Sequence, residues 1–155
     1  MNVLMIYPEF PDTFWSFKHA LSFINKKINN PPLGLMTIAP LLPASWDKRL
    51  VDMNLKPLKS ADIEWADLVL LSAMDVQRDA CNRVIRKVKQ FGKVILAGGP
   101  LFTAEYENFS EVDYFVLNEA EITLPLFLAD LESGRTPKRI YQTNEYADIQ
   151  SSPLP

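Results

Sequence analysis

Cysteine and histidine each occur only once in this chain of 155 residues, and both scarcities remove whole classes of chemistry. The single cysteine, Cys81, excludes an internal disulfide framework and any iron-sulfur cluster held by this chain's own thiolates. The single histidine, His19, leaves no grouping of nucleophile, histidine and carboxylate. Cys81 falls on the apolar face of an expected helix, which favours a small buried thiol over a reactive one.

Long apolar runs and basic segments are also missing. No apolar run approaches the length of a membrane span, and a strand pattern begins at Asn2 without a charged leader. These features favour a cytoplasmic protein. The net charge of −3, without a basic stripe, argues against nucleic acid as the main partner. Hydrophobic residues make up 48% and charged residues 23%, as in a globular chain, and the length suits one domain.

Short apolar runs alternate with helical patterns along the chain. The runs predict buried strands at Asn2–Tyr7, Arg49–Asp52, Leu68–Ser72, Val94–Ala97 and Tyr114–Leu117. The helical patterns cover Leu33–Leu42, Val76–Phe91, Thr103–Phe109 and approximately Leu124–Glu132. This alternation predicts an α/β fold with a flavodoxin-like (Rossmann-like), doubly wound, five-stranded parallel sheet in the order 2-1-3-4-5.

Two segments depart from the alternation. An aromatic, proline-rich insertion at about residues 8–31 is longer than a minimal α/β unit needs. It predicts either a lid or docking surface, or a hydrophobic cluster that covers the sheet. Residues 1–134 are expected to form the domain. Residues 135–155 are expected to add an edge strand at Arg139–Gln142 and then a polar linker towards a further domain.

Right-handed crossovers bring the ends of strands 1, 3, 4 and 5 to one edge of such a sheet, where ligands bind. Gly98 and Gly99 end the fourth strand there, so a ligand or a neighbouring backbone can approach closely. An ordinary tight turn is the alternative. The edge also carries Tyr7-Pro8-Glu9, Ser72-Ala73-Met74, Pro100 and Asn118-Glu119.

Three ligand classes known for related folds do not fit this edge. A phosphate-accepting receiver domain needs acidic residues after strands 1 and 3, where this chain has Pro8-Glu9 and Ser72-Ala73. A flavodoxin needs a hydroxyl- and glycine-rich loop after strand 1, and that loop is proline-rich and aromatic here. The Gly-x-Gly-x-x-Gly motif of a dinucleotide site is absent. A large flat ligand with a long tail fits better.

A set of short motifs carries a family resemblance along nearly the whole chain. They are Pro32-Leu-Gly-Leu35, Val51-Asp-Met-Asn54, Trp65-Ala-Asp-Leu-Val69, Ser72-Ala-Met74 with Gln77, Gly98-Gly-Pro100 and Leu117-Asn-Glu-Ala-Glu121. In this order and spacing the chain resembles the N-terminal cobalamin-binding domain of cobalamin-dependent radical S-adenosylmethionine enzymes. The hopanoid-methylase branch is the most similar.

The resemblance implies a role for each matching residue. Ser72 matches the serine that hydrogen-bonds the dimethylbenzimidazole tail of cobalamin, and Gly98 and Gly99 match the pair that makes space for the tail. Met74 and Gln77 match positions under or beside the corrin ring. The implied cofactor site comprises Ser72, Ala73, Met74, Gln77, Gly98, Gly99, Pro100, Asn118, Glu119 and Glu121. For the two glutamates, exposed acids stabilised by a helix dipole remain an equal alternative.

The chain departs from the family pattern at the cobalt ligand. Related domains carry Asp-x-His-x-x-Gly after strand 1, whereas here Phe14 stands two positions after Asp12. His19 lacks the flanking pattern, so a surface or packing role is expected for it. Asn118 replaces a usual glycine. The resemblance therefore implies bound cobalamin with no protein histidine on cobalt, as in many relatives.

The resemblance also implies that catalysis requires a second domain. Methylcobalamin would serve C-methylation by a radical S-adenosylmethionine domain that holds S-adenosylmethionine and a 4Fe-4S cluster, neither of which this chain can bind alone. A non-catalytic cobalamin- or tetrapyrrole-binding or sensing module, and a cofactor-free flavodoxin-like interaction domain, remain alternatives. If the two glycines provide space for the tail, Gly99→Val is expected to abolish cofactor binding and largely spare the fold.

Overall fold

The protein is described from a computed structural model, which places residues 1–12, 31–148 and 150. In this part of the chain, six strands form one parallel sheet in the order β2-β1-β3-β4-β5-β6. The strands are β1 (Asn2–Tyr7), β2 (Asp47–Asp52), β3 (Leu68–Ser72), β4 (Val94–Gly98), β5 (Tyr114–Leu117) and β6 (Ile140–Gln142). The predicted order is confirmed for the first five strands. The predicted count is one too low, because the expected edge strand pairs in parallel with β5 and becomes part of the sheet.

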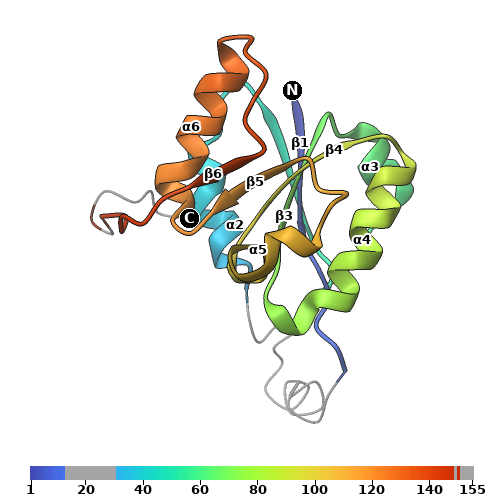
Figure 1. Cartoon of the computed structure of the whole chain (residues 1–155). Coiled ribbons are helices and arrows are strands. Elements are labelled where there is room, and N and C mark those ends of the chain that lie inside the picture. Colours follow the sequence, from blue (N-terminus) through green and yellow to red (C-terminus); the bar gives the residue numbers. More distant parts are fainter. Residues whose placement is uncertain (13–30, 149, 151–155) are drawn as a thin grey trace.

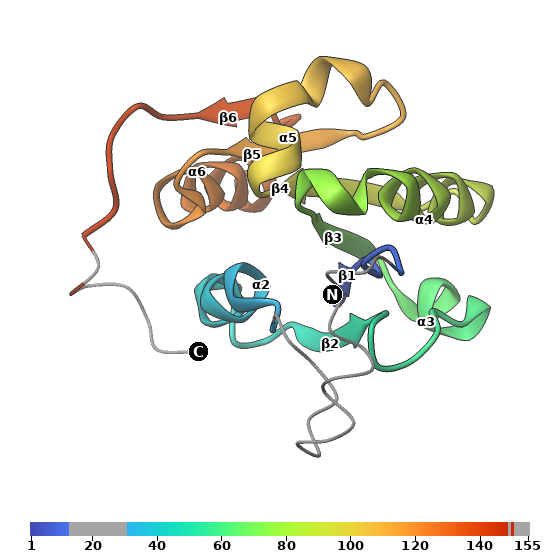
Figure 2. The same cartoon turned by 90° about the horizontal axis from the view of Figure 1, so that it is seen from below.

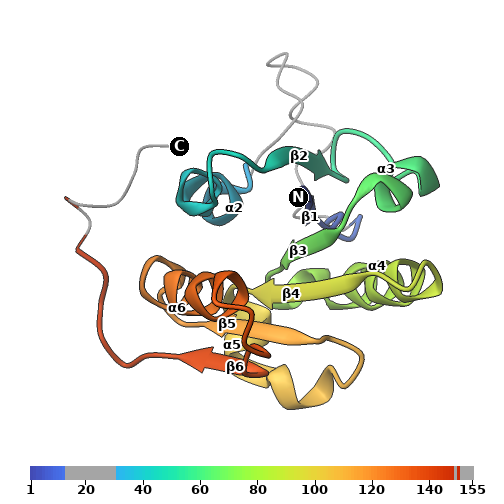
Figure 3. The same ribbon diagram turned by 90° about the horizontal axis from the view of Figure 1, so that it is seen from above.

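Helices cover both faces of the sheet. They are α2 (Leu33–Ile38), α3 (Ser60–Trp65), α4 (Arg78–Gln90), α5 (Pro100–Glu105) and α6 (Ala120–Glu132). In Figures 2 and 3, α2 and α6 lie on one side of the strands, and α3 and α4 lie on the other. The strands run downwards in Figure 1, so their carboxyl ends and the starts of the helices lie at its lower edge.

Each face of the sheet has its own hydrophobic core, because alternate residues of a strand point to opposite faces. In β1, Leu4 and Ile6 join the core under α3, α4 and α5, whereas Met5 joins the core under α2 and α6. The strands are therefore buried on both sides, and this explains their nearly continuous apolar sequences.

Helix α4 confirms the expected amphipathic pattern with one exception. Its buried face comprises Ala80, Cys81, Val84, Ile85 and Val88. Val76, which was predicted on the same face, is 59% exposed, because it belongs to a 3-10 turn at Asp75–Gln77 that precedes the helix. Gly92 follows the helix with a φ of 64°, as expected for a left-handed C-terminal residue. Burial raises the pKa of Cys81 to about 12, so the thiol is protonated and inert at neutral pH.

Three other helix boundaries differ from prediction. Ser60–Trp65, expected to be mostly connection, forms α3, in which only Ile63 is fully buried. Helix α5 begins at Pro100, because a proline suits the first turn of a helix, and it continues as a 3-10 turn at Tyr106–Asn108.

Helix α6 begins at Ala120 and contains Pro125, so Pro125 does not mark its start. The carbonyl of Glu119 accepts hydrogen bonds from the amides of Ile122 and Thr123 and closes the first turn. Helix α2 ends at Ile38 and tightens into a 3-10 turn at Ala39–Leu41, as expected from Pro40. Among the described residues, no helix has both the length and the apolar character to cross a membrane.

Candidate functional site

The loops after the strands meet at the carboxyl edge of the sheet. The chain passes from β1 to β2 on one side and then to β3 on the other, so the switch point lies between β1 and β3. Ligands of doubly wound α/β proteins bind at such a point. The predicted site residues follow β3, β4 and β5, and the fold therefore brings them to this edge.

A pocket of about 170 Å³ lies at the ends of β3, β4 and β5 and is closed by α2 and α6. Five of the ten predicted residues line this pocket, namely Ser72, Gly98, Gly99, Asn118 and Glu121. The rest of the wall is almost entirely apolar and comprises Gly34, Leu35, Thr37, Ile38, Leu70, Leu71, Leu96, Val116 and Ala120. We refer to it as the tail pocket. A flat, mostly apolar group suits such a wall.

Ser72 supplies a hydroxyl to this apolar wall. It is half-buried at the end of β3 and pairs in register with Gly98 of β4. The Ser72 hydroxyl has no hydrogen-bond partner within the described part of the chain, although hydroxyl groups in such positions normally find one. Its donor and acceptor capacity is thus available to a ligand in the tail pocket.

The two glycines leave space first of all for the protein itself. A Cβ on Gly98 would lie 2.8 Å from the carbonyl oxygen of Val116, and one on Gly99 would lie 2.6 Å from Oγ of Ser72. Gly99 also has a φ of 90°, which side chains rarely adopt. The expectation that Gly99→Val would largely spare the fold is therefore wrong. Gly99 is needed to end β4 and to let the Ser72 hydroxyl stand beside it.

Gly34, on the opposite wall, behaves differently. A Cβ added at this position of α2 would meet no atom within 4 Å, and its φ is not in the left-handed region. A Cβ at Gly34 would therefore meet open space, and no backbone strain opposes it. Because Gly34 lines the tail pocket, substitution there tests the pocket apart from the fold.

Asn118 stands where the family pattern has glycine, and its backbone explains the exchange. It is the one described non-glycine residue with a positive φ, at 62°. Asparagine tolerates this left-handed conformation better than other side chains do. The Asn118 amide nitrogen donates to Oγ1 of Thr103 at 3.0 Å, and its side chain donates to the carbonyl of Thr143. The residue thus ties the end of β5 to the segment that leaves β6.

The other predicted residues lie outside the tail pocket. Met74 and Pro100 are exposed at the carboxyl edge, and Glu119 precedes α6 as its N-cap residue. Ala73 is buried in the core under α3, α4 and α5, and its carbonyl accepts from the amide of Leu101 at 3.1 Å. These positions frame the edge but do not line the pocket.

Gln77 is fully buried and both ends of its side-chain amide bind protein. Its Oε1 accepts from the amide of Met74 at 2.8 Å, and its Nε2 donates to the carbonyl of Pro8 at 2.5 Å. The side chain therefore joins the loop after β3 to the loop after β1. The structure gives Gln77 a positioning role, because the side chain is fully buried and both its oxygen and its nitrogen bind backbone groups of the two loops.

Asn54 makes a second connection of the same kind, which the sequence did not reveal. Its Oδ1 accepts from the amide of Phe10 at 2.8 Å, and its Nδ2 donates to Oδ1 of Asp52 at 2.8 Å and to Pro8 at 3.3 Å. Together, Asn54 and Gln77 hold the loops after β2, β1 and β3 in one arrangement. Burial, and next the charge of Asp52, raise the pKa of Tyr7 at the end of β1.

Comparison with known protein families identifies the family of this chain. The profile of the B12 binding domain family matches residues 25–128, which is most of the chain. The chain belongs to the B12-binding domain family. The family resemblance predicted from the motifs is thereby confirmed, together with the cobalamin-binding fold that it implies.

Two curated relatives extend over the whole of this B12-binding domain. An uncharacterized methyltransferase of Synechocystis sp. (strain ATCC 27184 / PCC 6803 / Kazusa) is 42% identical over 158 aligned residues, covering 100% of this chain and 29% of the relative. The hopanoid C-2 methylase of Rhodopseudomonas palustris (strain TIE-1) is 30% identical, covering 99% of this chain and 30% of the relative. The chain thus spans less than a third of the length of these relatives. No solved structure matches the chain.

Some predictions about this B12-binding domain concern residues that the structure does not describe. His19 and the apolar positions of the insertion from residue 13 to residue 30 lie outside the described residues. The same holds for the last segment, residues 151–155. The described start of the insertion packs on the sheet, where the rings of Tyr7 and Phe10 meet edge to face at 5.8 Å.

The α2 wall of the tail pocket was not predicted as part of the site. Gly34 and Thr37 are small residues three positions apart on a helix that covers the sheet, so they face the same way and leave room. Gly34 belongs to the Pro32-Leu-Gly-Leu35 motif, which entered the family resemblance but was given no role, and Thr37 lies outside that motif.

Proposed function

We propose that this chain is the cobalamin-binding module of a radical S-adenosylmethionine methyltransferase, and that it carries methylcobalamin for C-methylation by a catalytic domain outside this chain. The family membership, a methyltransferase and a methylase among the relatives, and the greater length of both relatives support the proposal. The observation that carries it is the largely apolar tail pocket with the Ser72 hydroxyl at its wall, which has no partner among the described residues.

The dimethylbenzimidazole tail of cobalamin would enter the tail pocket between the sheet and helices α2 and α6. Its flat aromatic base suits walls made by Leu70, Leu96 and Val116, and its ring nitrogen can accept a hydrogen bond from the Ser72 hydroxyl. Gly98 and Gly99 serve this arrangement by placing Ser72 and the end of β4 correctly. The fit depends on residues from both walls of the pocket.

The corrin ring would rest on the carboxyl edge beside the pocket. Four exposed apolar side chains surround this edge, at Leu33, Leu55, Met74 and Val76. Exposed apolar groups of this size on a domain edge mark a binding surface. Met74 is 42% exposed, so it can contact the ring, whereas Gln77 acts by holding the Met74 backbone in place.

Bound cobalamin supplies a carrier for the methyl group, and the residues of this chain supply its position. Ser72 and the apolar walls bind the tail, Gln77 and Asn54 fix the loops under the ring, and Asn118 holds the exit segment. We propose that no protein histidine binds cobalt from below. S-adenosylmethionine and the 4Fe-4S cluster belong to the catalytic domain in this proposal.

The domain boundaries are part of the same proposal. Residues 1–134 form the cobalamin-binding domain, and residues 135–155 form the edge strand and the linker towards the catalytic domain. The hydrogen bond from Asn118 to the carbonyl of Thr143 supports this division, because it fixes the first residues of the linker beside the proposed cofactor edge.

Titration with hydroxocobalamin tests the proposal directly. The protein is mixed with hydroxocobalamin and passed over a gel-filtration column, with absorbance recorded for both protein and cofactor. We expect the cofactor to co-elute with the protein, and Ser72→Ala to retain less of it. Elution of the cofactor entirely in the small-molecule fraction, at protein concentrations up to the solubility limit, would contradict the proposal. His19→Ala is expected to leave the absorption spectrum of the bound cofactor unchanged.

A further inference from the structure

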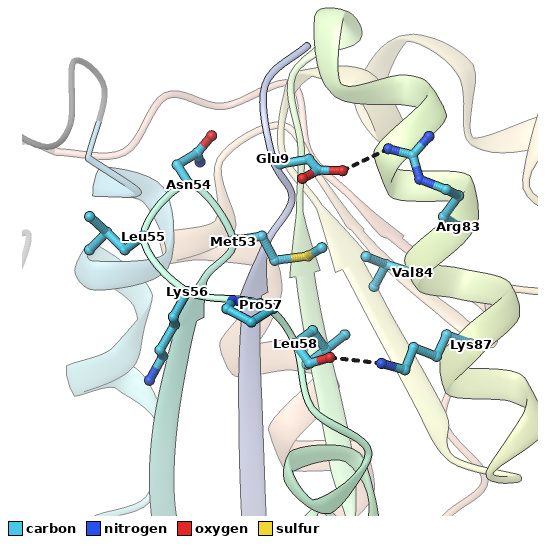
Figure 4. Close-up of a pocket in the computed structure, with 10 residues that line it drawn as sticks. All are labelled: Glu9, Met53, Asn54, Leu55, Lys56, Pro57, Leu58, Arg83, Val84 and Lys87. Carbon is cyan, nitrogen blue, oxygen red and sulfur yellow. Dashed lines mark hydrogen bonds and ion pairs between the residues drawn. The ribbon is translucent and has the colours of Figure 1, made fainter. Parts of the chain in front are cut away.

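A second hollow lies on the opposite face of the sheet from the tail pocket. It has a volume of about 380 Å³ and lies between helix α4 and the connection from β2 to α3, as Figure 4 shows. Its wall comprises Glu9, Met53, Asn54, Leu55, Lys56, Pro57, Leu58, Arg83, Val84 and Lys87. We call it the α4 hollow. It shares no lining residue with the tail pocket.

The middle of the α4 hollow is apolar. The side chains of Met53, Pro57 and Val84 face one another across it in Figure 4. Val84 and Leu58 belong to the buried core below, and Met53 packs on the same core. A floor of this kind favours the apolar body of a small molecule, and a methionine adapts its shape to the ligand.

A cationic side chain lies at each end of this apolar floor. At one end, Arg83 pairs with Glu9, with Nη2 and Oε1 2.8 Å apart. At the other end, one turn further along α4, Nζ of Lys87 donates to the carbonyl of Leu58 at 2.7 Å. Each cation uses one donor in these contacts. A guanidinium has five donors and an ammonium three, so both ends keep donors for a ligand.

The charge of the α4 hollow is opposite to that of the chain. Three cations and one carboxylate are among its lining residues, whereas the chain carries a net charge of −3. Lys56 points away from the hollow in Figure 4, which leaves Arg83 and Lys87 as the cations beside the floor. The side chains of Arg83 and Glu9 are 56% and 47% exposed, and such surface pairs open at little cost.

We propose that the α4 hollow binds a small organic anion with an apolar body and a carboxylate or phosphate head. The body lies on Met53, Pro57 and Val84. The head accepts hydrogen bonds from Arg83, with Lys87 as the second cation along the helix. A guanidinium can donate to two oxygens of either head group at once, and a charge-assisted contact of this kind is about twice as strong as a neutral one.

This site goes beyond the proposed cobalamin function and does not depend on it. The tail pocket lies under α2 and α6, and the α4 hollow lies beside α4 and shares no lining residue with it. Asn54 and Leu55 line the hollow and also belong to the edge proposed for the corrin ring, so anion binding is measured in the absence of hydroxocobalamin. Failure of cobalamin binding would leave the α4 hollow intact, and failure of anion binding would leave the tail pocket intact.

Nuclear magnetic resonance of the ¹⁵N-labelled protein tests the proposal with three matched probes. Hexanoate, hexyl phosphate and 1-hexanol each contain six carbon atoms in an unbranched chain and differ in the polar head group. We expect both anions to shift the amide signals of residues 53–56, 58 and 83–87 in a saturable way, and the alcohol to bind at least ~10-fold more weakly. The tighter of the two anions identifies the preferred head group.

Variants on one helix separate the proposed site from general surface charge. Arg83→Gln is expected to weaken anion binding about tenfold, and Lys87→Gln to weaken it less. Arg86→Gln, which removes a cation of the same exposed helix face outside the hollow, is the matched control and should bind like wild type. Shifts spread over the whole surface, equal binding of 1-hexanol, or equal weakening by Arg86→Gln would each overturn the proposal.

Discussion

The two hollows of this domain open on opposite faces of one sheet and differ in almost every property of their walls. The tail pocket is lined mostly by apolar and small residues, and the Ser72 hydroxyl at its wall has no hydrogen-bond partner among the described residues. The α4 hollow has an apolar floor between two cations. A neutral aromatic group suits the first and an anion suits the second. The two faces of this doubly wound sheet thus have chemically distinct hollows, because each face is covered by different helices.

The difference arises from how each pair of walls is kept apart. In the tail pocket, α2 contributes Gly34 and Thr37, whose small side chains leave a gap above Leu70 and Leu96. In the α4 hollow, the long side chains of Arg83 and Lys87 extend from α4 and bind Glu9 after β1 and Leu58 of the β2–α3 connection. Small residues leave space in the tail pocket, whereas polar contacts cross the space in the α4 hollow. Substitutions should therefore affect the two sites in different ways.

Substitution of Gly99 is expected to have the largest effect on the tail-pocket side. Gly99→Val places a β-branched residue at a φ of 90° and a Cβ 2.6 Å from Oγ of Ser72. Backbone strain and the close contact together should lower the free energy of unfolding by roughly 2–5 kcal/mol. Urea denaturation measures this value. A free energy of unfolding within roughly 0.5 kcal/mol of the wild-type value would contradict the described backbone at Gly99.

Loss of the Gln77 connection should come next. Gln77→Leu leaves the Met74 amide and the Pro8 carbonyl without partners, which should cost about 1–3 kcal/mol in stability. Cobalamin affinity should fall as well, because the loop that carries Met74 loses its anchor. Denaturation and cofactor titration of the same variant measure both effects.

Gln77→Glu separates positioning from general packing, because its shape is conserved. Its carboxylate can still accept from Met74 but would face the Pro8 carbonyl, so burial beside that oxygen raises the pKa of the new carboxyl in the folded state. A group with a raised folded pKa stabilises the protein at low pH, and this contribution is lost as pH rises through that pKa. The variant should thus be more stable relative to wild type at pH 5 than at pH 8. A pH-independent difference would argue against the connection.

Removal of the Ser72 hydroxyl should affect cofactor binding and leave the fold unchanged. Ser72→Ala loses one proposed hydrogen bond to the tail, worth about 1 kcal/mol or about a fivefold change in affinity. The hydroxyl makes no hydrogen bond in the described part of the chain, so thermal stability should stay at the wild-type value. Reduced stability with unchanged affinity would assign Ser72 to packing instead.

The smallest effect is expected on the other face. Glu9→Gln removes the partner of Arg83, and a pair this exposed contributes less than about 1 kcal/mol to stability. Hexanoate binding should become tighter, because the carboxylate that competes for Arg83 is gone. Weaker binding in this variant would place the anion elsewhere.

Much of the fold could be predicted because buried parallel strands have distinctive sequences. Runs such as Leu68–Ser72 and Tyr114–Leu117 are apolar along their whole length, and both strands form at the predicted residues. Helix α3 was missed because it is short and buries only one residue fully. Val76 was misplaced because periodicity does not show where a 3-10 turn gives way to an α-helix.

The candidate site could be predicted only in part, for a different physical reason. Residues at strand ends converge by topology, so Ser72, Gly98, Gly99 and Asn118 could be grouped from their positions. The roles of Gln77 and Asn54 depend on hydrogen bonds to Pro8, which lies 69 and 46 residues away in sequence. Local sequence contains no signal for such contacts. The open wall at Gly34 likewise becomes visible only when α2 is placed against β3 and β4.

The tail pocket is tested most directly by hydroxocobalamin titration of two matched variants. Gly34→Phe places an aromatic ring at the pocket, and its Cβ would have no protein atom within 4 Å. Phenylalanine also favours a helix more than glycine does. Ala129→Phe adds the same ring on an exposed position of α6, outside the pocket. We expect Gly34→Phe to fold like wild type and to lose cobalamin affinity by at least ~100-fold, and Ala129→Phe to bind normally. Wild-type affinity in a folded Gly34→Phe variant would contradict the assignment of the tail pocket.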